Sequence, residues 1–199
     1  MTGANESISV AVFLSGGGRT LQNLLEHRDV HGLPIDVRLV ISSRADVRGV
    51  QIAKDAGIET LVVRKKDHDD AEYCSAMFDP VRQSGADYVI MAGFLKHVLI
   101  PEDFEGRVIN IHPSLLPAFG GPGMYGHHVH AAALKRGVKV SGCTVHFVDN
   151  HYDNGPIILQ RTCDVFADDT PDTLAARVFE QECQALPDAI RTLRKIASS

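Results

Sequence analysis

Tryptophan is absent from the 199-residue chain and aromatic residues make up only 6% of it, so the hydrophobic core must be built from aliphatic side chains. No apolar run approaches the ~18 residues that a membrane-spanning helix needs. The net charge of −5 lacks the basic excess typical of proteins that bind nucleic acid or anionic membranes. The first residues, MTGANES, carry neither a basic segment nor a long apolar one, so we expect no export signal and a cytoplasmic protein.

The four cysteines, Cys74, Cys143, Cys163 and Cys183, form no Cys-x-x-Cys pair. Closely spaced pairs of that kind are typical of zinc sites and redox motifs. A chain of this length also buries enough surface to fold without a disulfide or metal staple. We therefore expect reduced, mostly buried thiols and no metal site.

Short β-branched runs alternate with amphipathic stretches, a pattern that predicts an α/β fold with a mainly parallel, Rossmann-like twisted sheet and helices on both faces. The last two apolar runs follow one another without a helix, which favours an antiparallel region at one edge. No linker divides the chain, so we expect a single domain over residues 1–199.

Strands are expected at 8–14, 37–42, 60–63, 88–92, 108–111, 139–148 and 157–165, and helices at 20–28, 47–56, 70–84 and 170–197. Pro80 should kink or shorten the third helix, and Pro187 should bend or divide the last.

Three glycines follow the first expected strand and open the first helix, in the segment SGGGRT at residues 15–20. Glycine lets the backbone turn sharply and bring N–H groups close to a ligand, and a helix N-terminus attracts anions. Leu21 stands where a dinucleotide-binding motif has its third glycine, and the P-loop lysine is missing. The segment therefore suits a single phosphate beside Arg19, although a tight turn with a solvated arginine fits it equally well.

Asn110 and His112 alternate with two isoleucines in the segment RVINIHP, so they share one face of a strand that Pro113 ends. Ligands of open α/β sheets bind at the carboxyl ends of the strands. The glycine- and proline-rich loop at residues 113–126 is too long for a tight turn, and such loops are usually functional or mobile. The pair thus predicts a ligand site, against the alternative of two strand-end residues satisfied by nearby backbone.

A strong turn signal, HYDNGP at residues 151–156, separates the last two expected strands. Asp153 in this turn has two possible roles. It can shape the turn through its own backbone, or it can face His112 across the site. The segment alone leaves both open.

Taken together, these segments resemble the phosphoribosylglycinamide formyltransferase family, the folate-dependent formyltransferases of purine synthesis. The resemblance runs from Val10 to about Leu193 and is carried by VFLSGGGRTLQNLL, DYVIMAGFLK, INIHPSLLP, VSGCTVHFVDNHYDNGPIILQ and RVFEQE. It implies transfer of a formyl group from 10-formyltetrahydrofolate, a co-substrate and not a bound cofactor, to the amine of glycinamide ribonucleotide. It also implies small-molecule partners only, in a monomer or homodimer. The alternatives are hydrolysis of the formyl donor, transfer to another amine, or a non-enzymatic domain that binds a phosphorylated ligand.

The resemblance also implies roles for individual residues. The catalytic Asn, His and Asp of the family correspond to Asn110, His112 and Asp153, its phosphate loop to Gly18, Arg19 and Thr20, a ribose-contacting Glu to Glu182, and its folate segment to Leu95, Lys96, His97 and Val98. Two departures affect the folate tail. Lys96 stands where the family often has Arg, and Asp70 falls on a basic position, although Arg64, Lys65 and Lys66 nearby can compensate.

The implied chemistry is direct attack by the amine, without a metal or a covalent intermediate. Preorganised donors stabilise the oxyanion that develops. Asn110 would supply an amide N–H, and a charged His112 would supply a proton and later protonate the leaving nitrogen. Asp153 would favour the charged form of His112 and orient a water that carries a proton from the amine.

The remaining histidines have weaker assignments. His127, His128 and His130 have no carboxylate or cysteine at ligand spacing, so we favour an exposed helix start over a metal site. His128 or His130 lining the substrate site is the second interpretation. His146 alternates with apolar residues in a strand, so we expect it to be structural.

Overall fold

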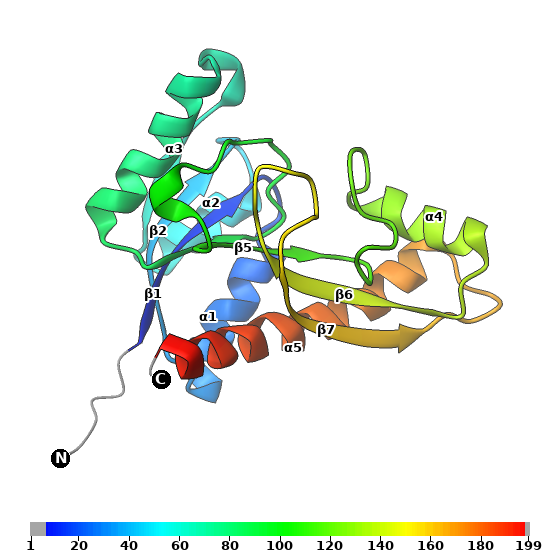
Figure 1. Cartoon of the computed structure of the whole chain (residues 1–199). Helices are drawn as coiled ribbons and strands as arrows, with labels where there is room; N and C mark the ends of the chain where they lie inside the picture. The colour runs from blue at the N-terminus through cyan, green and yellow to red at the C-terminus, as the bar shows by residue number, and fades with distance from the viewer. Residues whose placement is uncertain (1–6, 198–199) are drawn as a thin grey trace.

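The chain folds into a seven-stranded sheet with helices on both faces, described for residues 7–197 of a computed structural model (Figure 1). Residues 1–6, where we expected no export signal, lie outside this range. The strands are β1 (Ile8–Leu14), β2 (Ile35–Ser42), β3 (Glu59–Val62), β4 (Tyr88–Met91), β5 (Val108–His112), β6 (Val140–Phe147) and β7 (Ile157–Asp164). The helices are α1 (Arg19–His31), α2 (Arg48–Asp55), α3 (Asp70–Ser84), α4 (His127–Arg136) and α5 (Pro171–Ala197), with short 3₁₀ turns at Lys65–Asp67 and Glu102–Phe104.

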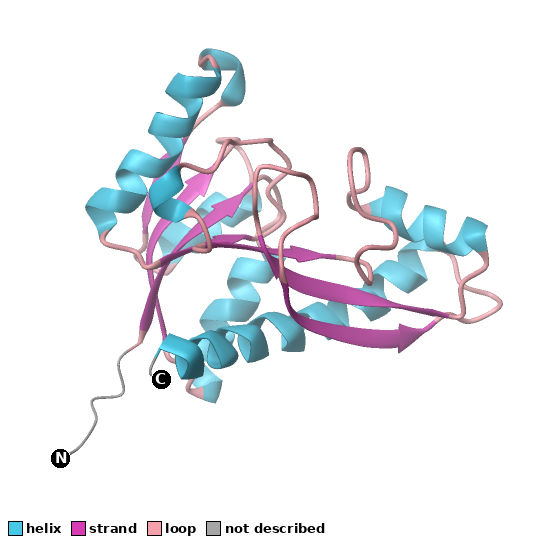
Figure 2. Cartoon of the chain, viewed as in Figure 1, coloured by secondary structure: helices cyan, strands magenta, loops and turns pink. Residues whose placement is uncertain are grey.

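The sheet order is β3-β2-β1-β4-β5-β6-β7. The first five strands pair in parallel, and β6 and β7 add to β5 in antiparallel fashion. Both the mainly parallel sheet and the antiparallel edge region predicted from the sequence are therefore confirmed. The strand order reverses between β1 and β4, and the loops that follow the parallel strands gather at that end of the sheet (Figure 2). Ligands of doubly wound sheets bind at this position.

The core on one face of the sheet is aliphatic, as predicted, but the prediction is wrong for the other face, where Phe13, Tyr73, Phe78 and Phe104 are buried. One cluster joins the sheet to α1, α2, α4 and α5, and a second joins the other face to α3. Strand β1 is buried along its whole length, which explains its near-continuous apolar sequence. Within the described residues, no helix is both long enough and apolar enough to cross a membrane.

Helix α5 runs without interruption although Pro187 lies inside it, so the division that we expected there is wrong. Proline removes one helical hydrogen bond, but packing on both sides of it can hold a helix together. Leu186 and Ala189 are fully buried beside Pro187 and supply that packing. Helix α3 likewise keeps its full predicted length around Pro80. Its ends are fixed by a capping box at Asp69 and by a left-handed Gly85.

The glycine loop between β1 and α1 packs directly against the first turn of α2. Gly18 caps α1 with a φ of 71°, and a Cβ added there would lie 2.5 Å from the Cα of Gly49. The N–H of Gly49 donates a hydrogen bond to the carbonyl of Gly16, with an N···O distance of 3.1 Å. Gly18 is therefore required by backbone conformation and by close contact at once.

We predict that Gly18→Ala lowers the free energy of unfolding by about 2 to 4 kcal/mol, because it adds a left-handed alanine and a backbone clash. Gly17→Ala is the matched control, since its Cβ would have no atom within 4 Å and its φ is ordinary. The control should change stability by less than about 0.5 kcal/mol. Urea denaturation of both variants measures the difference. Equal stabilities would contradict the conclusion that the backbone requires glycine at position 18.

Candidate active site

A cavity of about 590 Å³ opens at the carboxyl ends of β4 and β5, where α1, α4 and α5 approach the sheet. Nearly all the site residues predicted from the sequence lie on its wall: Arg19, Thr20, Leu95, Lys96, His97, Val98, Asn110, His112, Asp153 and Glu182. Gly18 is the exception. It shapes the loop that carries Arg19 and does not line the cavity itself.

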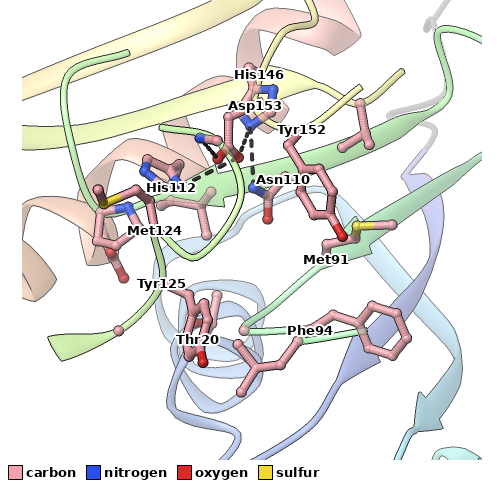
Figure 3. A pocket seen from close by; sticks show the side chains of 18 of the residues that line it. Thr20, Met91, Phe94, Asn110, His112, Met124, Tyr125, His146, Tyr152 and Asp153 are labelled. Atoms are coloured by element: carbon pink, nitrogen blue, oxygen red, sulfur yellow. Dashed lines mark hydrogen bonds and ion pairs between the residues drawn. The ribbon is translucent and has the colours of Figure 1, made fainter. Parts of the chain in front are cut away.

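Asn110, His112 and Asp153 converge at one end of the cavity (Figure 3). The first two lie on one face of β5, as the strand period predicts, and Asp153 reaches them from the turn between β6 and β7. One carboxylate oxygen of Asp153, Oδ1, lies 3.5 Å from His112 Nδ1. The other, Oδ2, accepts the N–H of Gly121 at 2.8 Å. Of the two roles left open for Asp153, the structure thus shows the one that faces His112.

His112 is 4% exposed, and both of its ring nitrogens face oxygen acceptors. Nε2 donates to the carbonyl of Phe119 at 2.9 Å, and Nδ1 faces the Asp153 carboxylate. A neutral imidazole carries only one N–H, so it can donate to only one of these two acceptors at a time. The 3.5 Å distance between His112 Nδ1 and Asp153 Oδ1 exceeds that of a normal hydrogen bond, so Asp153 does not hold Nδ1 as firmly as Phe119 holds Nε2.

His146, which we expected to be purely structural, also belongs to this cluster. Its Nδ1 donates to the carbonyl of Phe147 at 2.8 Å, so the neutral ring presents the Nε2 lone pair to Asn110 Nδ2 at 3.2 Å. Burial lowers the pKa of His146, which favours this neutral form. The contact orients the Asn110 amide and leaves its second N–H available. The signal that could reveal it is the register of β6, which places His146 opposite Asn110.

The glycine loop and α5 form the other end of the cavity. The Arg19 guanidinium lies over the ring of Phe179, 3.5 Å from its centroid. Stacking of this kind holds a guanidinium in place and leaves its N–H edge free. Together with Thr20 at the N-terminus of α1, it forms a cationic subsite that suits an anion. Phe179 was not predicted from the sequence, because its distance from Arg19 is set only by the packing of α5.

Glu182 lies on the cavity wall beside this subsite. Burial raises its pKa from 4.5 to about 7, and the charge of Arg19 opposes that rise only in part. At neutral pH the carboxyl therefore binds a proton part of the time. It can donate or accept a hydrogen bond with a hydroxyl group of a ligand.

Two loops flank the third side of the cavity. The predicted folate segment, 95–98, is held by the hydroxyl of Ser15, which accepts the N–H of Leu95 at 2.9 Å. The segment 148–152, which was not predicted, faces it, and the rings of His97 and Tyr152 lie 5.2 Å apart. Asp70 lies outside the cavity wall and forms an ion pair with Lys65, which also does not line the cavity.

The histidine-rich helix start at α4 contributes two side chains to the wall. His127 and His130 line the cavity, and His128 does not. His130 is 4% exposed, and burial lowers its pKa, so this ring is predominantly neutral. No group of three or more metal-ligating side chains occurs among residues 7–197. All four cysteines are free thiols in this structure.

The chain matches the Formyl transferase family over residues 8–190. It is 41% identical over 189 residues to the chloroplastic phosphoribosylglycinamide formyltransferase of Vigna unguiculata, covering 92% of this chain and 60% of that protein. The corresponding enzyme of Escherichia coli K12 is 36% identical over 184 residues, with 90% and 84% covered. A crystal structure of glycinamide ribonucleotide transformylase 1 from Symbiobacterium toebii superposes with a TM-score of 0.86 at 38% identity, covering 93% of this chain and 86% of that one. The chain thus spans about three fifths of the length of the plant relatives that it matches.

We predict that Glu182→Gln stabilises the protein at alkaline pH. The folded state holds the Glu182 proton more tightly than the unfolded chain does, so stability falls as pH rises from 4.5 through about 7. Glutamine removes this loss, which amounts to at most about 3 kcal/mol at pH 8 and vanishes near pH 4. Urea denaturation at both pH values tests the sign. A variant that is less stable than the parent at pH 8 would contradict the buried, proton-binding carboxyl.

Proposed function

Because the chain belongs to the formyl transferase family, we propose that it transfers a formyl group from 10-formyltetrahydrofolate to the amine of 5-phosphoribosylglycinamide, in de novo purine synthesis. The observation that carries this proposal is the convergence of Asn110, His112 and Asp153 at one end of a single cavity, with a cationic subsite at the other. The names of the relatives and of the similar crystal structure support the same substrates.

We propose a place on the cavity wall for each substrate. The phosphate of the nucleotide binds at Arg19 and Thr20, and Glu182 contacts the ribose. The amine then points along α5 toward the catalytic cluster. The formyl folate, a co-substrate and not a resident cofactor, enters between the segments 95–98 and 148–152, so that its formyl carbon meets the amine beside Asn110.

In the proposed reaction the amine attacks the formyl carbon directly, and the carbonyl oxygen gains negative charge. The free N–H of Asn110 and the imidazolium of His112 stabilise that oxyanion in a site shielded from solvent, where one such donor contributes about 3 to 4 kcal/mol. Asp153 stabilises the imidazolium and accepts the amine proton through a water. His112 then protonates the leaving folate nitrogen, and transfer of the proton held by Asp153 to His112 restores the starting charges of the pair.

We further propose that the reaction takes place in the cytoplasm. Four free thiols in a chain of this size suit a reducing compartment. The partners are small molecules, and the acidic net charge of −5 fits neither nucleic acid nor an anionic membrane as a ligand.

The direct experiment is a formyl-transfer assay with purified protein, both substrates and detection of tetrahydrofolate and formylated product. We expect release of tetrahydrofolate that depends on the nucleotide. Equal release without the nucleotide would identify a hydrolase instead, and absence of both products would leave a binding domain.

We predict that Asp153→Asn lowers kcat by at least about 100-fold, because the variant can neither hold the imidazolium charge nor accept a proton. The pH dependence of kcat should change as well, since asparagine does not titrate. Asp46→Asn is the control, because Asp46 is exposed and outside the cavity wall. Unchanged turnover of the Asp153 variant across pH argues against the catalytic assignment.

We predict that Arg19→Ala raises KM for the nucleotide by about 10- to 100-fold with a smaller change in kcat, because it removes a charged hydrogen bond to the phosphate. Arg48→Ala is the matched control. Arg48 is an exposed residue of α2 that bonds only Gln22 and does not line the cavity. Steady-state kinetics at saturating formyl donor measures KM for the nucleotide in both variants. Equal values for the Arg19 and Arg48 variants would contradict the assignment of Arg19 to the phosphate subsite.

A further inference from the structure

The loop at residues 113–126 touches both members of the catalytic pair through its backbone, not through its side chains. The carbonyl of Phe119 accepts the Nε2–H of His112, and the N–H of Gly121 donates to Asp153 Oδ2. These are the shortest polar contacts that either side chain makes, at 2.9 and 2.8 Å. The position of the loop backbone therefore sets the orientation of both groups.

The loop can make these contacts only because it has a glycine, without a side chain, where its backbone passes Asp153. A Cβ added at Gly120 would lie 3.2 Å from the Cβ of Asp153, closer than side chains normally pack. Asp153 itself is held in the left-handed region, with a φ of 51°. A non-glycine residue adopts that conformation at a cost, which the contacts of its side chain must offset. The loop and the turn are thus fitted to each other closely.

The loop is itself anchored at its base by one hydroxyl group. Thr144 of β6 is fully buried, and its Oγ1 donates to the carbonyl of Ser114 at 2.7 Å and accepts the N–H of Leu116 at 3.0 Å. Gln160 of β7 donates from Nε2 to the same Oγ1 at 2.9 Å and to the carbonyl of Leu116 at 3.0 Å. A hydroxyl has one donor and two acceptor positions, and all three are used here.

We propose that Thr144 and Gln160 are positioning residues, which fix the 113–126 loop so that its Phe119 carbonyl and Gly121 N–H hold His112 and Asp153 in reactive alignment. This inference rests on the proposed function, because it concerns the alignment of groups assigned to formyl transfer. Neither Thr144 nor Gln160 lines the cavity, so they act only through the loop.

The sheet register explains why these two positions carry the anchor. Thr144 lies opposite His112 across the β5–β6 pair and opposite Gln160 across the β6–β7 pair. One row of residues across three strands thus contains the catalytic histidine, the buried hydroxyl and the amide that completes its hydrogen bonds. The loop returns over this row between Ser114 and Leu116.

The experiment compares Thr144→Val, which keeps the shape and removes the hydroxyl, with Thr144→Ser, which keeps the hydroxyl. We expect the valine variant to lose about 10- to 100-fold in kcat, the range for small misplacements of reacting groups. Its KM for the nucleotide should stay close to that of the parent, because the phosphate subsite lies on α1 and α5. The serine variant should recover most of the kcat. Thr162→Val on β7 is the control, since Thr162 is exposed and pairs with Gly142 instead of Thr144 in the sheet.

Gln160→Leu tests the same anchor at an exposed position, where the substitution leaves the core intact if the valine variant fails to fold. We expect the same fall in kcat at constant KM, together with faster hydrogen exchange at the Gly121 amide. A Gln160 variant with parental kcat and parental amide exchange would overturn the proposal, as would a serine variant no better than valine. Failure of the parent to transfer formyl would refute the proposed function itself, and amide exchange at Gly121 would still report on the anchor.

Discussion

The Asp153 carboxylate is the group on which the geometry of the site depends. Its side chain is only 14% exposed, and a carboxylate removed from water needs donors or positive charge around it. Gly121 supplies a backbone N–H to one carboxylate oxygen, and Nδ1 of His112 faces the other at 3.5 Å. The left-handed backbone of Asp153 and the glycine at position 120 both let the loop and the turn come close enough to supply these contacts.

The antiparallel addition of β6 to a parallel sheet brings His146 and Thr144 beside the residues that we propose to be catalytic. In the register of this pair, Asn110 faces His146 and His112 faces Thr144. A slip of one residue would turn every side chain of β6 to the other face of the sheet. Thr144 and Val145, which precede His146 in β6, are fully buried and make such a slip costly, so core packing also fixes the pairing of these residues.

The sequence was sufficient for the features that depend on local pattern. Strand alternation placed Asn110 and His112 on one face, and the glycine loop marked the N-terminus of α1. The resemblance supplied Asp153, which the turn signal alone left open. His146 and Phe179 were missed because their contacts depend on strand register and on helix packing. The length of α5 was predicted, but its unbroken course through Pro187 was not, since buried neighbours outweigh the local preference of proline.

Helix α5 serves two purposes along its length. Its first half lines the cavity with Phe179 and Glu182, and its second half completes the core with Leu186 and Ile190. Because α5 follows all the other described elements in the chain, a ribosome delivers it after them. A chain that ends before α5 would therefore lack part of the main core cluster and part of the cavity wall at once.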